Sequence, residues 1–476
     1  MSTATNKTAG LQRLGQHCAV LLGCLAVFAH GQSAKRPPAP QFSLAQLRFS
    51  PINPAARPAG LGGAFIGVAN DATAAAINPA GVAYLARPEI SMSQAWGRST
   101  RDFPDHATSD KSASSLRFNG TLVNIIYPFK GFTFALYHQL AFRSQFKFER
   151  EQFLTFAASR PLTLHEQLGA AGNFPGLRSE FFFEVWQDAF VIAKTLKRRL
   201  RLGAALRSTQ LRLNLQEHHY FAPELWLQSE PSPRTVAQKR ANGLYRIYHA
   251  QRDEFRAAWN IGLLYELDKR LTLGAVYHRL PSYTIDHLRT LPAYSLPDRT
   301  PNDGRDEALQ FPAEEVHTPF QLDLPDNWGL GLSWKAGGNN LVALDVVFHR
   351  SRSLLQGAAQ ILPQDDIMTE TGEYLDPDNR VDLESEELFS VHAGVEHVLL
   401  WSQAKMPLRV GIYNEPVFGL HASANDANLR REYPKPGKRW HLAGGTGLII
   451  KNFRFEMSLD FATTSVEAIG SAVVSF

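Results

Sequence analysis

The sequence predicts an all-β protein: a 14-stranded antiparallel transmembrane β-barrel with an N-terminal hatch, or plug, inside its lumen. Three observations lead to this prediction. Several segments alternate apolar and polar residues, the connections between them are short and long in turn, and an apolar, glycine-rich stretch precedes the first of them. Alternation with period two is typical of a sheet whose two faces meet different surroundings.

The clearest alternating segment is residues 453–461, FRFEMSLDF, in which five apolar residues share one face and Arg, Glu, Ser and Asp share the other. Residues 211–216, 328–334 and 408–413 repeat the pattern. A soluble sandwich and a membrane barrel both alternate, and they differ in which face is apolar on the outside. Local alternation therefore does not distinguish a sandwich from a barrel, and the lengths of the connections between strands must be used instead.

Joins between the strand candidates alternate in length. Those near residues 130, 197, 268, 337, 403 and 451 are short, whereas most of the intervening joins are long and polar. Outer-membrane barrels have tight periplasmic turns and longer extracellular loops, so this rhythm favours a barrel. The 14 candidates are residues 88–98, 115–130, 131–149, 180–195, 199–216, 253–267, 270–287, 318–335, 339–351, 387–401, 405–416, 438–451, 452–464 and 466–476.

The N-terminus has the pattern of an export signal. Lys7 and Arg13 precede the apolar run at residues 18–29, which is shorter than the roughly 20 residues a spanning helix needs. We expect cleavage before Gln32. A lipobox ending at Cys24 is the alternative, but apolar residues continue beyond that cysteine. Both cysteines lie in this run, so we expect no disulfide in the mature chain.

The expected domain organisation is a signal peptide (1–31), a periplasmic N-terminal segment with the hatch (32–87) and the transmembrane barrel (88–476). The net charge of +4 is small for 476 residues and argues against a nucleic-acid partner. Aromatic residues make up 11% of the chain, as expected of a barrel with aromatic girdles.

Residues 60–81, GLGGAFIGVANDATAAAINPAG, are small and apolar, and Asp71 is their only ionised residue. The stretch is too rich in glycine for a spanning helix and lacks the alternation of a strand, so we interpret it as a plug. Its glycine spacing does not match a phosphate-binding loop, and close backbone packing in a narrow lumen explains it better. In the turn at residues 78–81, Asn caps its own backbone, Pro fixes φ and Gly permits a left-handed residue.

On residues 62–81, GGAFIGVANDATAAAINPAG, the chain resembles the FadL/TodX family of outer-membrane channels for hydrophobic compounds. The NPAG core at residues 78–81 is intact and Asp71 is retained, whereas Asn70 stands where an acidic residue is common. LPDNWGLGLSW at residues 324–334 and PLRVGIYNEP at residues 407–416 are more weakly similar to family strands.

The resemblance implies a barrel whose hatch blocks a straight aqueous passage. A long-chain fatty acid or an aromatic hydrocarbon would enter from outside, bind in apolar pockets, and leave sideways through the wall. It implies a monomer in the Gram-negative outer membrane that contacts lipid and lipopolysaccharide and has no enzymatic activity, cofactor or metal. The implied hatch or gating residues are Gly62, Gly63, Phe65, Asp71, Asn78, Pro79, Ala80 and Gly81, and the implied ligand contacts are Phe65, Ile66 and Ile77.

The chain ends on an aromatic residue, Phe476, at the end of an alternating segment. Outer-membrane barrels characteristically end this way, and we expect the barrel assembly machinery to read this strand.

Two other functions remain open. PorV-type subunits of type IX secretion resemble the same fold but act as docking shuttles without small-molecule transport. An outer-membrane enzyme is the other, but no nucleophile–base arrangement is visible. Asp345 with Glu396 could in principle form a carboxylate pair, although polar lumen lining explains both.

The remaining polar motifs are explained by structural roles without a specific function. His138, His278, His349 and His441 lack the convergent spacing of a metal site and are expected to be lumen or loop residues. The acidic residues from Asp376 to Glu387 are expected to form a solvated extracellular loop, with a loose divalent or lipopolysaccharide-bridging site as the alternative. The basic run from Pro231 is expected to be a surface loop that meets anionic lipid heads, with nucleic-acid binding as the alternative. Pro281 and Pro325 could kink strands and mark a wall opening, or lie near loop-side strand ends.

Overall fold

The computed structural model describes residues 47–103, 111–150, 153–154, 173–174, 176–220, 244–291, 294–297, 308–311, 313–356, 383–422, 430, 434–436 and 439–476. The expected signal peptide, the basic run from Pro231 to Arg240 and the acidic residues 376–382 lie outside the described residues.

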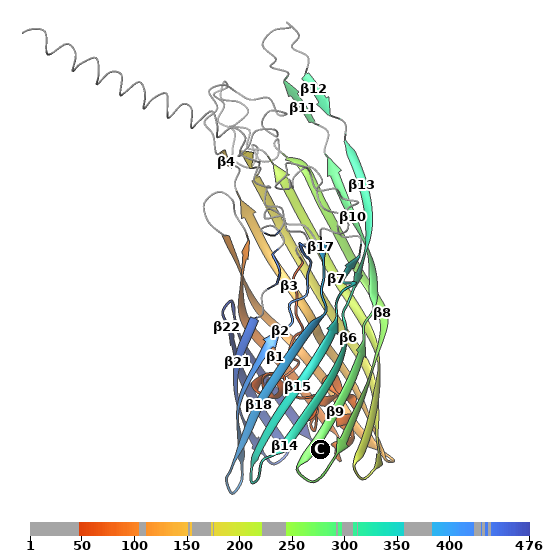
Figure 1. Ribbon diagram of the computed structural model, residues 1–476, viewed down its shortest axis with the longest axis vertical. Helices are drawn as coiled ribbons and strands as arrows, with labels where there is room; N and C mark the ends of the chain where they lie inside the picture. The colour runs from red at the N-terminus through yellow and green to blue at the C-terminus, as the bar shows by residue number, and fades with distance from the viewer. Residues whose placement is uncertain are drawn as a thin grey trace, which may run out of the picture.

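One antiparallel sheet closes on itself to form the barrel (Figure 1). Its first strand, β1 (Glu89–Phe103), pairs with β2 (Lys111–Phe129) on one side and with the last strand, β23 (Ser465–Ser475), on the other. Such closure joins the first strand to the last, which is what a β structure needs in lipid. All 14 predicted strands are present in the described residues, so the predicted fold class is confirmed.

Two of the 14 strands are interrupted in the wall. β9 (Leu271–Arg279) continues as β10 (Ser282–Leu291), and β13 (Glu314–Asp323) continues as β14 (Asp326–Lys335). Pro281 and Pro325 lie at the two breaks, where neither needs a backbone N–H for the ladder. The other wall strands are β3 (Phe132–Arg150), β6 (Gly176–Lys197), β7 (Leu200–Tyr220), β8 (Leu244–Glu266), β15 (Asn340–Arg350), β18 (Leu388–Leu400), β19 (Lys405–Glu415), β21 (Arg439–Ile450) and β22 (Phe453–Ala462).

Short strands accompany the wall. β16 (Leu355–Gln356) pairs with β13, and three two-stranded pairs are separate from the barrel sheet. These pairs are β4 (Phe153–Leu154) with β5 (Asn173–Phe174), β11 (Tyr294–Pro297) with β12 (Ala308–Phe311), and β17 (Leu383–Glu384) with β20 (His421–Ala422).

The predicted tight turns gather at one end of the barrel, beside the C-terminus (Figure 1). Between β2 and β3 the turn is Lys130-Gly131, and both residues have positive φ, +48° and +81°. Positive φ at two central residues matches the twist of the flanking strands, and this permits a two-residue hairpin.

A belt of apolar side chains faces outward around the wall. On β22, Phe453, Phe455 and Met457 are each at least half exposed, while Glu456 and Ser458 between them are buried in the lumen. On β14, Trp328, Leu330 and Trp334 are exposed on the same outward face.

The upper part of β7 has the opposite orientation to β22. Arg212 and Asn214 face outward, whereas Leu211 and Leu213 are buried inside. A barrel wall that carries polar residues outside has left the lipid, and its apolar side chains then pack with each other in the lumen. These inward residues belong to an apolar cluster, here called the upper cluster: Leu47, Phe49, Ala141, Phe142, Phe181, Phe183, Val185, Leu211, Leu213, Leu215, Ala250, Leu280, Tyr283, Ile285, Phe320, Leu322, Leu324, Leu354, Phe418, Leu420 and Ala422.

Among the described residues, no helix has the length and apolar composition needed to cross a membrane.

The two orientations predict different responses to the same substitution. Leu330→Arg places a charge in the middle of the outward belt and should destabilise the barrel by about 2–4 kcal/mol. Asn214→Arg adds the same charge to the outward face of upper β7 and should change stability by under about 0.5 kcal/mol. Urea unfolding in phospholipid vesicles measures both. Equal losses in the two variants would contradict the assigned lipid belt.

Candidate functional site

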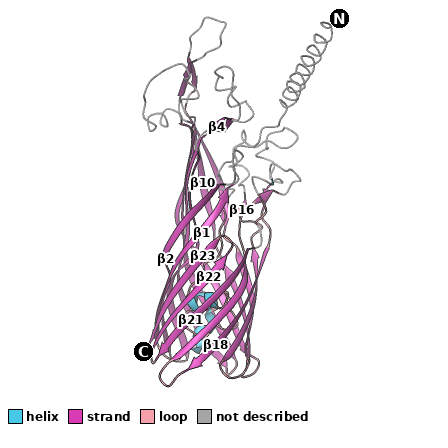
Figure 2. Cartoon of the chain, turned by 90° about the vertical axis from the view of Figure 1, so that its left-hand side faces the viewer, coloured by secondary structure: helices cyan, strands magenta, loops and turns pink. Residues whose placement is uncertain are grey.

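Residues 47–85, here called the lumen segment, lie inside the barrel, where Figure 2 shows their helices enclosed by the strands. They form α2 (Ala56–Gly60), α3 (Ala74–Ile77) and the 3-10 helix η3 (Pro79–Tyr84). The earliest described residues contact the upper cluster: Phe49 forms a β-bridge with Phe418, and Ile52 N donates to Ala141 O at 3.0 Å. Residues 47–54 therefore lie against the wall strands inside the barrel.

Glycines of the wall allow the lumen segment to touch the strands backbone to backbone. They form three cross-strand pairs, here called the glycine belt: Gly203 with Gly262, Gly274 with Gly331, and Gly394 with Gly411. A Cβ on Gly262 would lie 2.1 Å from Asn78 Oδ1, and one on Gly411 would lie 2.1 Å from Gly62 N. Any side chain at these positions would push the segment off the wall.

Asn78 connects three parts of the structure through one side chain. Its Nδ2 donates to Ile66 O at 2.9 Å and to Leu263 O of β8 at 3.3 Å, while its Oδ1 accepts from Ala80 N at 3.2 Å. The last bond caps η3, and Pro79 begins that helix. The turn prediction for Asn78 and Pro79 agrees with this geometry.

Gly81 differs from the expectation. It is part of η3 and does not have positive φ, so left-handed backbone is not the reason for glycine here. A Cβ would lie 2.2 Å from Ala69 O, which means that close packing explains the residue. Positive φ occurs instead at Gly62 (+64°) and Gly63 (+78°), which turn the chain out of α2.

Asp345 of β15 holds the middle of the lumen segment. Its Oδ2 accepts hydrogen bonds from Phe65 N at 2.6 Å and from Ile66 N at 2.7 Å. Two backbone donors that no helix or strand satisfies thereby find a partner on the wall. The residue opposite Asp345 on β18 is His392, and Glu396 lies four residues further along that strand. Asp345 and Glu396 therefore do not form the carboxylate pair considered from the sequence.

A buried network of charges fastens the lumen segment to the strands that follow β15 around the wall, namely β18, β19 and β22. Arg57 contacts Asp71 at 2.7 Å within the segment and Glu396 of β18 at 3.1 Å. Glu396 also accepts from Arg409 Nε at 2.6 Å, and Arg409 continues to Glu456 at 2.7 Å. Arg454 joins from β22 at 3.2 Å from Asp71. Three cations thus meet three carboxylates, so each buried charge has partners.

Asp71 stays ionised in this network. Burial alone would raise its pKa, but the nearby Arg57 and Arg454 guanidinium groups lower the pKa to about 2. Its Oδ1 accepts from Thr73 N and Thr73 Oγ1, which shapes the turn before α3. The one acidic residue of the predicted plug therefore both closes a local turn and binds the wall.

A cavity of about 180 Å³ lies between the lumen segment and the upper cluster. Its apolar walls come from both sides: Ile66, Ala76 and Ile77 belong to the segment, while Phe142, Leu280 and Phe418 belong to the cluster. Polar side chains complete the lining: Asn53, Gln139, Gln187, Arg207, His278, Asn327, His349 and His392.

The predicted ligand contacts are placed differently from one another. Ile66 and Ile77 line the cavity, whereas Phe65 does not. The Phe65 ring is fully buried, with the Arg57 guanidinium 5.4 Å from its centroid. Among the lining residues that sequence reasoning missed, Arg207 and His392 carried no signal beyond their alternating positions in β7 and β18.

Hydrogen bonds fix the neutral form of His278 and the proton on Nδ1 of His392. Arg207 can only donate, so His278 Nδ1 accepts from it at 3.1 Å, and His278 Nε2 carries the proton donated to Ile77 O at 3.1 Å. His392 Nδ1 donates to Gly62 O at 2.8 Å, and its Nε2 is 3.0 Å from Ser390 Oγ. His278 is therefore a neutral ring, and both histidines contact the backbone of the lumen segment.

The wall is incompletely paired beside the cavity. β2 and β3 pair only from Leu122–Gln139 to Phe129–Phe132, and above that point the described part of β2 pairs with β1 alone. A bulge in β3 between Leu140 and Phe142 lies at this boundary. Gln139 and Phe142 both line the cavity, so the cavity adjoins this gap, here called the β2–β3 seam.

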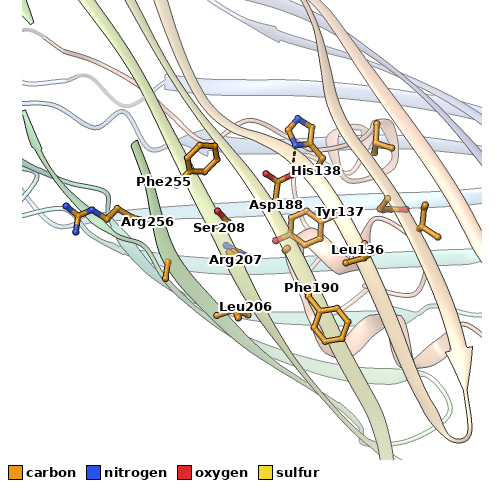
Figure 3. Close-up of a pocket in the computed structure, with 15 residues that line it drawn as sticks. Leu136, Tyr137, His138, Asp188, Phe190, Leu206, Arg207, Ser208, Phe255 and Arg256 are labelled. Carbon is orange, nitrogen blue, oxygen red and sulfur yellow. Dashed lines mark hydrogen bonds and ion pairs between the residues drawn. The ribbon is translucent and has the colours of Figure 1, made fainter. Parts of the chain in front are cut away.

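An apolar groove lies on the outer face of β2, β3, β6, β7 and β8, just below the seam (Figure 3). Leu136, Phe190 and Leu206 are exposed there. Figure 3 also shows His138 and Asp188 facing each other, with their Nδ1 and Oδ1 atoms 2.7 Å apart. Within the described parts of the chain, no three His, Cys, Asp or Glu side chains gather as a metal site.

Solved structures share this fold. A Pseudomonas aeruginosa FadL homologue matches at a TM-score of 0.55 and 12% identity, over 90% of this chain and 99% of that one. The Pseudomonas putida toluene transporter TodX matches at 0.50 and 12%, over 91% and 99%. The Ralstonia pickettii toluene transporter TbuX matches at 0.50 and 14%, over 89% and 97%. No family model matches the sequence, and neither does any curated protein.

The glycine belt makes a testable prediction. Gly262→Ala introduces a Cβ 2.1 Å from Asn78 Oδ1 and should destabilise the protein by about 1–3 kcal/mol, because overpacking displaces the NPAG turn. Gly120→Ala is the matched control, since nothing lies within 4 Å of its added Cβ. Thermal unfolding in detergent measures both. Identical transitions for the two variants would refute the close contact.

The charge network makes a second testable prediction. Glu396→Gln removes the carboxylate that Arg57 and Arg409 share. It should lower the free energy of local opening of the lumen segment by about 3–5 kcal/mol. Hydrogen exchange should rise in residues 56–71 while the wall strands stay protected. Glu180→Gln, which removes an exposed carboxylate on β6, should leave exchange unchanged. Unchanged protection in the Glu396 variant would remove the network as an anchor.

Proposed function

From the FadL/TodX fold of this chain, we propose that the protein is an outer-membrane channel for the passive uptake of hydrophobic small molecules. The single observation that carries the proposal is the partly open cavity between the lumen segment and the upper cluster. Burial in such a site is favourable by about 0.8 kcal/mol per methylene group, which suffices to draw an apolar solute out of water.

The lumen segment acts as the hatch in this proposal. Its backbone lies against the glycine belt and its charges are bound to the wall, so it obstructs the barrel below the cavity. Gly62, Gly63, Asp71 and the residues 78–81 hold it there by the contacts described above. Transport proceeds without catalysis, because the residues that line the cavity bind and orient a solute and need do nothing more.

The solute leaves sideways through the β2–β3 seam. The cavity adjoins the seam at Gln139 and Phe142, and the apolar groove on the outer wall begins just below it. An exit into lipid spares an apolar solute the return to water that a straight channel would impose.

Uptake tests the proposal directly. A deletion strain should take up at least one of three radiolabelled solutes, toluene, p-toluate and hexadecanoate, more slowly than its parent, and the wild-type gene should restore the rate. The substituted pair Asn119→Cys with Arg143→Cys, joined by a short bismaleimide across the seam, should again slow uptake. Ser208→Cys with Ala257→Cys, which face each other across a paired seam, is the control. Unchanged uptake of all three solutes in the deletion strain would reject the proposal.

Removing the hatch tests its role separately. A chain that lacks residues 60–81 should form pores of larger single-channel conductance in planar bilayers, because the segment fills the lumen. The full-length protein is the reference. An unaltered conductance trace would argue against a plug. Normal uptake in the deletion strain, combined with capture of exported proteins on the extracellular loops, would instead favour a docking subunit.

A further inference from the structure

Arg207 of β7 is a buried cation with no anion beside it among the described residues. Three arginines are buried among the described residues, namely Arg57, Arg207 and Arg409. Arg57 and Arg409 each contact carboxylates within 3.1 Å. Arg207 is only 3% exposed, yet the described residues bring no carboxylate within 4.0 Å of it. A buried charge is costly unless an opposite charge or strong hydrogen bonds compensate for it.

The partners that Arg207 does have are neutral and few. Its Nη2 donates to His278 Nδ1 at 3.1 Å and to Ala76 O at 3.4 Å, which is a long hydrogen bond. Its Nε is buried and has no hydrogen-bond partner in the described structure. The guanidinium of Arg207 therefore has N–H donors without acceptors among the described residues at the wall of the cavity.

The rest of the cavity limits what could use those donors. Its other lining side chains include no lysine, arginine, aspartate or glutamate, and His278 is neutral, so Arg207 is the one group there whose charge is fixed. Ile66, Ile77, Phe142, Leu280 and Phe418 supply the apolar surface. At about 180 Å³ the space is close to an engineered cavity of 150 Å³ that takes one benzene ring, and smaller than pockets for larger ligands.

We propose that this cavity binds a compact hydrophobic monocarboxylate, about the size of one substituted aromatic ring, with its carboxylate on Arg207 and its body against Phe142, Leu280 and Phe418. The inference rests on the proposed function and names its substrate class. A guanidinium pairs with a carboxylate through two parallel hydrogen bonds, and that pairing would satisfy the donors that Ala76 and His278 leave free. A plain hydrocarbon leaves the charge uncompensated, and a long-chain acid exceeds the space.

Binding to the purified full-length protein in detergent tests the proposal. The probes are p-toluate, p-xylene, in which a methyl group replaces the carboxylate, and hexadecanoate. The wild-type protein should bind p-toluate at least tenfold more tightly than p-xylene by calorimetry. Hexadecanoate should not displace p-toluate. Equal affinity for p-toluate and p-xylene would overturn the assigned charge, and displacement by hexadecanoate would overturn the size limit.

Substitution locates the effect. Arg207→Gln should weaken p-toluate binding at least tenfold and leave p-xylene binding unchanged. Arg201→Gln, on the same strand but paired with Glu266 and away from the cavity, should bind both probes as the wild type does. Loss of preference in both variants would assign it to general damage. If Arg207→Gln does not fold, the wild-type comparison of the two probes still decides the question.

The outcomes separate this inference from the proposed function. Binding and uptake of p-xylene with no preference for p-toluate would leave a hydrophobic channel and reject the acid. Failure to bind all three probes, together with unchanged uptake in the deletion strain, would reject the channel itself.

Discussion

A second layer of backbone inside a closed barrel is the constraint on which this structure depends. The lumen segment has little regular structure, so its polar groups need partners on the wall, and its volume needs space that side chains would otherwise fill. Asp345 and Asn78 meet the first need by bonding the segment's N–H and C=O groups. The glycine belt meets the second by removing side chains where the two backbones touch. The cavity exists because this fit ends where the upper cluster begins.

Much of the fold was predictable from the sequence because a barrel in lipid imposes a local rule on each strand. Alternation and turn length depend on near neighbours, so residues 453–461 and the six tight turns could be interpreted one by one. The same rule does not tell which face is outside: residues 211–216 have the same alternation as 453–461, but their apolar side chains lie inside the barrel. Which face is outside depends on height relative to the lipid, and no local pattern records height.

The site was less predictable for a related reason. The NPAG turn and Asp71 stand out by composition, and the structure shows what each one contacts. Arg207, Asp345 and Glu396 are single polar residues at lumen-facing positions, and nothing in their neighbours tells them apart from other lumen polar residues. Their partners come from strands or helices 13 to 339 residues away, so only the closed barrel reveals whether a charge is compensated, as for Glu396, or left over, as for Arg207.

In the outer-membrane channel proposed above, the packing of the lumen segment has a consequence for antibiotic entry. A pore filled to the wall by backbone contacts and buried ion pairs would offer hydrophilic drugs no continuous column of water. A cell could then carry many copies of this barrel without weakening its outer permeability barrier, which an open porin of the same strand number would breach. In that channel, the glycines that bring the segment against the wall would also determine which molecules stay outside.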